Sequence, residues 1–412
     1  MKTNVLLNSD NRKKILNLIY SVGATAVFNM VIQFLVYPDF ERRLGSEQYG
    51  VVLSMISLVS IIAGSCGYAV NCSRLLGVTT GRNNNGDYNL ILLAMGFIGS
   101  LIGVAYLFYL DIASPLTVGL YIALMFTTML RYYSEVDFKL STNFFRYMIY
   151  YLLVSVGYII GLFVFHLTEQ WMLALILGEA LAFVYVCIRG TLYRRPMIKK
   201  SDDLKPIFAS IVFVLISSLI DNLTLNADRI LLLSLTGDGT AVTTYYIASL
   251  VGKVIALLTV PINALLISYL VRYSGALTRK LWSIVIGAAI VFGGAAFGGC
   301  MLVSPWLIGI LYPDNLTAVS AFFVPAILGQ IFYFVSGVLM ATLLRFKGEK
   351  KQFIFNTGYA VEFFACVILG TVLGGLNGFI WAIVLANALR FVGALIWGFI
   401  PTKNIAPVQE QA

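Results

Sequence analysis

Long apolar runs joined by short polar segments make up most of this chain. A hydrocarbon core about 30 Å thick is crossed by about 20 apolar residues in a helix, and twelve runs of about that length stand in the sequence. They are too long for barrel strands, which read as alternating segments of about ten residues, so helices must satisfy the backbone. The pattern predicts an all-α polytopic membrane protein with helices near 15–37, 49–72, 89–110, 116–133, 146–166, 171–189, 207–227, 244–268, 282–304, 316–339, 352–373 and 378–399.

The composition agrees with this pattern. Of the 412 residues, 59% are hydrophobic and 11% are charged, whereas a soluble domain has about 25% charged residues. A water-soluble fold is therefore excluded. The first run follows a basic lead, Arg12-Lys13-Lys14, as a secretory signal would, but it stays apolar to Tyr37, so we interpret it as a retained helix. The five cysteines lack metal-ligand spacing, and we expect buried thiols.

Basic residues gather in alternate loops. With the N-terminus in the cytoplasm, only Arg42, Arg43 and Arg229 of the 28 Lys and Arg fall in outer loops, Lys253 and Arg390 lie within helices, and the others lie in inner segments or at the inner ends of helices. Because inner loops carry the excess of Lys and Arg, we expect both termini in the cytoplasm. The net charge of +9 thus indicates topology and contact with anionic lipids, and we find no nucleic-acid-binding motif.

The most basic connection, 189–205, divides the chain in the middle. We predict two domains: residues 1–200, an N-terminal six-helix bundle with a basic cytoplasmic linker from about 189, and residues 201–412, a C-terminal six-helix bundle. An even number of helices per half makes such a repeat parallel. Tyr49 and Tyr245 echo this repeat, because each opens an apolar run after a Gly-containing outer turn.

Two short motifs resemble those of a known family. The turn Arg42-Arg43-Leu44-Gly45, followed after three residues by Tyr49-Gly50, resembles the loop after the first helix of polysaccharide (O-antigen) repeat-unit flippases. Asp228-Arg229-Ile230-Leu231-Leu232 and Tyr245-Tyr246-Ile247-Ala248, which close the predicted seventh helix and open the eighth, resemble the same family. These flippases belong to the multidrug/oligosaccharidyl-lipid/polysaccharide exporter superfamily. The motif resemblance covers residues 38–54 and 221–263, and the topological resemblance covers all twelve predicted helices.

The resemblance implies two six-helix bundles that form a V around a central cavity, open alternately to each side of the membrane. It also implies a cargo, lipid-diphosphate-linked oligosaccharide carried on undecaprenyl diphosphate. The chain would flip repeat units of O-antigen lipopolysaccharide, or of a similar surface polysaccharide, to the outer leaflet of a bacterial inner membrane. A polysaccharide polymerase and a chain-length regulator are the expected protein partners, beside membrane lipids. We expect a monomer, because a two-bundle protein encloses its own pathway, and we expect no enzymatic activity, cofactor or metal.

Polar side chains within the predicted helices define the expected substrate site. A charge at the bilayer centre costs between about 2.5 and over 10 kcal/mol, so it should face protein or water. Amides and hydroxyls suit a sugar headgroup, and Lys253 and Arg229 would supply positive charge for a diphosphate. The expected cavity residues share helix faces: Asn29 with Gln33, Asn222 with Asn226 and Arg229, and Tyr245 with Ser249 and Lys253, together with Asp221. The competing interpretation is interhelical hydrogen bonding, with Asp221 paired to Lys253.

Three further charges lie deep in predicted helices: Glu179, Glu362 and Arg390. Either glutamate can carry a coupling proton, because a low-dielectric environment disfavours the charged form. A structural contact is the alternative, and Arg390 can pair with Glu362. His166, the only histidine, is expected to be a solvated residue at an outer helix end, where it cannot build a metal site alone.

Other functions stay open at this level. A multidrug or metabolite cation antiporter of the same fold would need an essential carboxylate. The first helix offers Asn29 and Gln33 instead, so Asp221 or Glu362 would have to serve. A membrane-embedded polymerase or glycosyltransferase would need a large polar loop, which the predicted outer loops do not provide. A channel usually assembles from fewer helices per chain. We find no Gly-rich phosphate loop, so we do not expect ATP to be the direct energy source.

Overall fold

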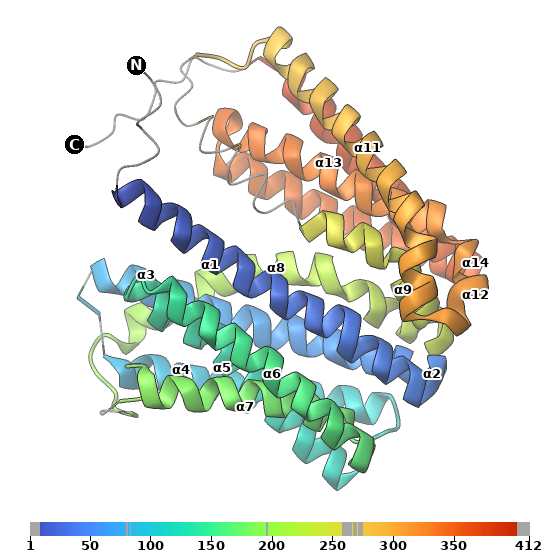
Figure 1. Ribbon diagram of the computed structural model, residues 1–412. Helices are drawn as coiled ribbons and strands as arrows, with labels where there is room; N and C mark the ends of the chain where they lie inside the picture. The colour runs from blue at the N-terminus through green and yellow to red at the C-terminus, as the bar shows by residue number, and fades with distance from the viewer. Residues whose placement is uncertain are drawn as a thin grey trace. The chain divides into compact units, whose positions relative to one another are not determined.

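The computed structural model describes residues 9–79, 81–82, 84–194, 197–257, 266, 270 and 275–401. Every regular element among them is a helix, which confirms the all-α membrane fold (Figure 1). The end of the predicted helix 244–268 lies outside the described residues. The elements are α1 (Ser9–Val31), η2 (Ile32–Val36), α2 (Tyr37–Val59), η3 (Ser60–Gly64), α3 (Ser65–Thr79), α4 (Asn85–Tyr109), α5 (Pro115–Leu140), α6 (Phe144–Thr168), α7 (Trp171–Arg189), α8 (Leu204–Thr236), α9 (Gly239–Leu257), α11 (Arg279–Leu311), η4 (Pro313–Asn315), α12 (Leu316–Ser320), α13 (Phe323–Lys347) and α14 (Glu349–Phe399).

Eight helical stretches within the described ranges are long and apolar enough to cross a membrane. Two of them have room for two crossings each: Ile19–Val78, with 60 residues, and Lys350–Phe399, with 50. Glycine interrupts both, since Gly45 has φ 77° and the pair Gly374 and Gly375 leaves helical geometry. An unbroken helix of 60 residues would be about 90 Å long, three times the thickness of the hydrocarbon core. The count of twelve crossings and the cytoplasmic termini stay predictions.

Contacts group the chain into two compact units. Unit 1 comprises Met1–Gly45 and Met55–Ala227. Within it α6 packs on α1 and α7, and α5 packs on α3, α4 and α7 (Figure 1). Small residues set the closest approach, because a Cβ added to Gly161 on α6 would lie 2.3 Å from the carbonyl oxygen of Ala174 on α7. Such small-residue contacts hold membrane helices together, because the hydrophobic effect does not drive helices to associate within lipid.

Unit 2 comprises Ser46–Ser54 and Asp228–Ala412. Within it α13 packs on α9, α11 and α14 (Figure 1). The two halves of α14 lie against each other, since the rings of Phe355 and Trp397 stack at 5.2 Å. Helix α8 contributes to both units, and the chain crosses from unit 1 to unit 2 inside it, after Ala227. The domain boundary near residue 200 was predicted from the basic linker. That boundary stays a prediction.

The segment Ser46–Ser54 joins unit 2 through a backbone-to-backbone contact. A Cβ on Gly50 would lie 1.8 Å from the carbonyl oxygen of Gly239, and one on Gly239 would lie 2.0 Å from that of Glu47. Thr243 also donates to the Ser46 carbonyl at 2.6 Å. Neither backbone can retreat as a flexible side chain would, so glycine is required at both positions.

We therefore expect Gly50→Ala to lower the unfolding free energy by at least about 1–3 kcal/mol, the usual cost of overpacking. Thermal denaturation of the purified protein in detergent measures the effect. Gly287→Ala on α11 is the matched control, because its added Cβ meets nothing within 4 Å and alanine stabilises a helix relative to glycine by about 0.5–1 kcal/mol. Equal melting temperatures of Gly50→Ala and the wild type would show that the two backbones lie farther apart than in this structure.

Candidate functional site

Lys253 on α9 forms an ion pair with Asp228 on α8. Its Nζ donates to Asp228 Oδ2 at 2.6 Å, and the side chains are 20% and 6% exposed. The carboxylate explains how the chain carries a lysine in this environment, because a buried charge needs a hydrogen-bonded counter-ion. The sequence offered Asp221 as a partner of Lys253, and the structure shows Lys253 paired with Asp228.

A second cation and two aromatic rings surround this pair. The guanidinium of Arg229 lies 4.9 Å from the ring centre of Tyr246, and the ammonium of Lys253 lies 5.1 Å from that of Tyr245. The Tyr245 hydroxyl donates to the Asp228 carboxylate. Both cations interact electrostatically with Asp228. We call these five residues the cation cluster, and with two basic groups and one acid it carries one excess positive charge.

The predicted face of α9 consists of Tyr245, Ser249 and Lys253, which are spaced four residues apart. Its first two residues are buried, and the third is partly accessible. Tyr245 is 1% exposed and Ser249 is completely buried. Ser249 donates to the Tyr246 carbonyl at 3.1 Å and also hydrogen-bonds the Tyr245 hydroxyl. Lys253 is the one member of this face with substantial access. An external anion would therefore meet Lys253 before the other two.

The amides on α8 that precede Arg229 lie in unit 1. Asn222 Nδ2 donates to Ser65 Oγ and to the Ser218 carbonyl, each at 3.0 Å. Asn226 Nδ2 donates to the Asn222 carbonyl at 3.2 Å. The first of these contacts ties α8 to α3, as the interpretation of interhelical hydrogen bonding expects. Whether they also contact substrate stays a prediction, as it does for Asp221.

Asn29 and Gln33 are both half-buried in unit 1. Asn29 Nδ2 donates to the Thr25 carbonyl at 2.9 Å. Gln33 lies in the π-helical turn η2, which follows α1 directly. Such turns are rare and occur frequently at functional sites. A role of these two amides in binding stays a prediction.

Unit 1 contains a buried ion pair of its own. Arg131 Nε on α5 donates to Glu179 Oε1 on α7 at 2.9 Å, and the side chains are 7% and 1% exposed. Tyr158 on α6 donates to the same oxygen at 2.8 Å. The Arg131 guanidinium also lies 4.2 Å from the ring centre of Tyr132 and 5.0 Å from that of Phe28. Glu179 is therefore committed to an internal partner in this conformation.

Glu362 and Arg390, both on α14, do not pair with each other. Arg390 lies over the rings of Tyr333, at 4.9 Å, and Tyr359, at 4.4 Å. Within the part of the chain that the structure describes, Glu362 Oε1 is buried without a hydrogen-bond partner. The expected Arg390–Glu362 pair is therefore wrong, and aromatic faces stabilise the guanidinium instead.

Sequence reasoning missed Asp228 and Arg131 as buried partners. The predicted helices 207–227 and 116–133 ended at or near these charges, whereas α8 continues to Thr236 and α5 to Leu140. One signal could have found both residues, because each charge deep in the membrane needs a counter-ion. Because both charges stood at or near a predicted helix end, their pairing with a residue on another helix was not considered.

His166 pairs with Asp39 at 2.7 Å and both are partly exposed. All five cysteines are free thiols. Among the described residues, no group of three His, Cys, Asp or Glu is placed to hold a metal ion.

No protein-family model and no curated protein sequence matches the chain. Solved structures match over nearly its whole length. An inward-facing multidrug-resistance MATE family transporter of the MOP superfamily matches with a TM-score of 0.68 and 15% identity, over 92% of this chain and 97% of that one. Lipid II flippase MurJ, in an inward closed conformation, matches with a TM-score of 0.69 and 14% identity, over 93% and 87%. The Vibrio cholerae MATE transporter VcmN, in its bent form, matches with a TM-score of 0.54 and 14% identity, over 93% and 95%.

These neighbours are described as transporters and a flippase. At 14–15% identity the likeness concerns the fold. The chain is a multi-pass membrane protein with the fold of MOP-superfamily transporters.

Proposed function

We propose that this protein flips lipid-diphosphate-linked oligosaccharide repeat units, of O-antigen or a similar surface polysaccharide, to the outer leaflet of a bacterial inner membrane. The observation that carries the proposal is the cation cluster, in which Arg229 and Lys253 outnumber the single carboxylate Asp228. The family resemblance of the motifs around these residues supports it. A flippase for another lipid-linked cargo, lipid II, has the same fold.

The chemistry of the cluster suits a diphosphate. Phosphate oxygens bind best to charged donors, and a lysine ammonium serves as a compact point charge while an arginine offers a fixed fork of donors. Lys253 is held by Asp228, which positions its ammonium and leaves one-fifth of the side chain accessible. A diphosphate would bind the accessible side of Lys253 and offset the excess positive charge.

In this proposal, the negative charge of the cargo favours its movement out of the cell. The site opens first to the cytoplasm and then to the outside, while the polyprenyl tail stays in lipid. An anion that leaves a negative interior gains about 2.3 kcal/mol per charge per 100 mV, and bound cations cancel part of this gain. A polysaccharide polymerase and a chain-length regulator would act on the exported units.

A multidrug or metabolite cation antiporter is the second candidate. It is favoured by Glu362, a carboxylate on α14 whose Oε1 is buried with no hydrogen-bond partner among the described residues. Such a group can exchange a proton for a cation. Glu362→Gln separates the candidates, because it would abolish export of cationic dyes by an antiporter and leave flipping of an anionic headgroup intact unless a proton drives it.

Deletion of the gene in its own organism tests the proposed function. We expect completed lipid-linked repeat units to accumulate on the cytoplasmic leaflet, where a membrane-impermeant glycosidase added to spheroplasts cannot reach them. The full-length chain should restore access, and a chain carrying Lys253→Ala should not. Accumulation of shorter lipid-linked units would contradict export and indicate an assembly enzyme.

A further inference from the structure

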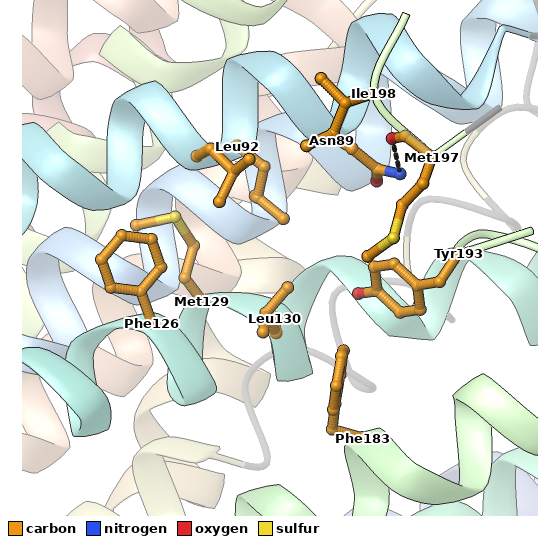
Figure 2. Close-up of a pocket in the computed structure, with 10 residues that line it drawn as sticks. Asn89, Leu92, Phe126, Met129, Leu130, Phe183, Tyr193, Met197 and Ile198 are labelled. Carbon is orange, nitrogen blue, oxygen red and sulfur yellow. Dashed lines mark hydrogen bonds between the residues drawn. The ribbon is translucent and has the colours of Figure 1, made fainter. Parts of the chain in front are cut away.

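Unit 1 contains an apolar pocket that the proposed function does not use. It has a volume of about 200 Å³ and lies among α4, α5, α7 and the linker that follows α7. Figure 2 shows Leu92, Phe126 and Leu130 on the helices, with Met197 and Ile198 of the linker on one side. An engineered cavity of about 150 Å³ lined by Leu, Ile and Phe stays dry and binds benzene. The linker pocket, as we call it, is therefore suited to a segment of hydrocarbon rather than to water.

The linker forms one wall of this pocket. Hydrogen bonds from α4 and from Asn84, the residue that precedes α4, hold the linker backbone in place. Asn84 Nδ2 donates to the Lys199 carbonyl at 2.9 Å, and Asn85 Nδ2 donates to the Thr191 carbonyl at 3.0 Å. Asp87 Oδ1 accepts from the backbone N–H of Ser201 at 2.8 Å. These contacts hold the linker against unit 1 in one arrangement.

The outer surface of the linker combines positive charge with exposed apolar side chains. Met197 is 51% exposed and Ile198 is 59% exposed. Arg194, Lys199 and Lys200 beside them are exposed as well. Basic residues next to membrane helices on the cytoplasmic side attract anionic headgroups, and exposed apolar side chains beside them enter the interface. The charge selects an anionic lipid over a zwitterionic one.

One polar group in the pocket lacks a partner. Asn89 is 5% exposed, and its Nδ2 donates to the carbonyls of Met197, at 3.0 Å, and Leu192, at 3.3 Å (Figure 2). Its Oδ1 is buried and has no hydrogen-bond partner in the part of the chain described. A buried acceptor left unpaired is costly. Because this oxygen is inaccessible, the apolar lining of the pocket and the positive charge beside it decide which ligand fits.

We propose that the linker pocket binds one anionic glycerophospholipid, such as phosphatidylglycerol. A segment of acyl chain fills the apolar volume beside Leu130. The phosphate lies near Lys199 and Lys200. The site lies wholly in unit 1, so it is independent of the cation cluster and of the cargo proposed above.

Native mass spectrometry of the full-length protein in detergent tests this site with phosphatidylglycerol and phosphatidylcholine of identical acyl chains. We expect the wild type to retain one phosphatidylglycerol in preference to phosphatidylcholine. The variant Lys199→Gln/Lys200→Gln should bind phosphatidylglycerol about thirtyfold more weakly, from the usual contribution of two lysines near an anionic surface. Its weak binding of phosphatidylcholine should not change.

Leu130→Trp fills the pocket and should abolish binding of both lipids. Leu93→Trp, at a more exposed lining position, replaces it if the first variant does not fold. Leu302→Trp on α11, 82% exposed, is the matched control and should bind as wild type. Equal retention of the two lipids by wild type, or wild-type retention by the folded tryptophan variant, would overturn the proposal. Competition by free glycerol phosphate as strong as by the intact lipid would overturn the acyl site.

Discussion

Arg131→Ala is expected to lower the unfolding free energy by about 3–5 kcal/mol, because it leaves the carboxylate of Glu179 buried without its counter-ion. Both side chains are almost inaccessible and their atoms lie 2.9 Å apart. Loss of the contacts with the Tyr132 and Phe28 rings adds to the cost, since a desolvated cation–π contact contributes about 2 kcal/mol. Reversible unfolding in mixed micelles, followed by tryptophan fluorescence, measures the change.

Two controls separate the ion pair from simple truncation. Arg146→Ala on α6 removes an exposed arginine and should change stability by no more than about 0.5 kcal/mol. The double variant Arg131→Met/Glu179→Gln removes both charges and keeps an acceptor for Tyr158, so it should recover most of the loss. If Arg131→Ala unfolds like the wild type, the buried pair is not formed in the membrane-embedded protein.

Lys253→Ala is expected to reduce flipping of the lipid-linked oligosaccharide by about 10- to 100-fold. Under the proposed function, the variant would lose one charge-assisted bond to the diphosphate, which is worth about 1.5–3 kcal/mol. Initial rates in proteoliposomes, normalised to the amount of folded protein, give the comparison. Lys253→Arg should retain part of the rate, because it preserves the charge but not the compact ammonium.

Lys205→Ala supplies the matched control, since Lys205 is an exposed lysine near the start of α8. Its rate should equal that of the wild type. A wild-type rate for Lys253→Ala would remove the cation cluster from the substrate site. A loss in both variants would point to general sensitivity to charge instead.

Hydropathy predicted the helical membrane fold because the cost of exposing a backbone to lipid leaves few alternatives. It misplaced the ends of α8 and α5, because both helices continue past charged residues. Asp228 and Arg131 lower the local hydropathy, yet each is neutralised by a partner on another helix, Lys253 and Glu179 respectively. A local average cannot detect that compensation, because the partner lies 25 to 48 residues away.

The candidate site was predictable in part for the same reason. Spacing placed Tyr245, Ser249 and Lys253 on one face of α9, and the structure shows all three on that helix with hydrogen bonds that join the first two. Spacing could not show that Arg390 lies between aromatic rings, since Tyr333 comes from another helix. Contacts across helices depend on packing, which the pattern along one helix does not encode.

The double variant Asp228→Asn/Lys253→Met tests the central claim most directly, because it removes both charges of the Lys253–Asp228 pair, so that neither is left buried without the other. We measure its flipping of a fluorescent lipid-diphosphate oligosaccharide in proteoliposomes beside the wild type and Lys253→Met. The account predicts that the double variant folds and melts like the wild type but flips no faster than Lys253→Met. Recovery of the wild-type rate would contradict it and would show that the pair serves only to hold α8 against α9.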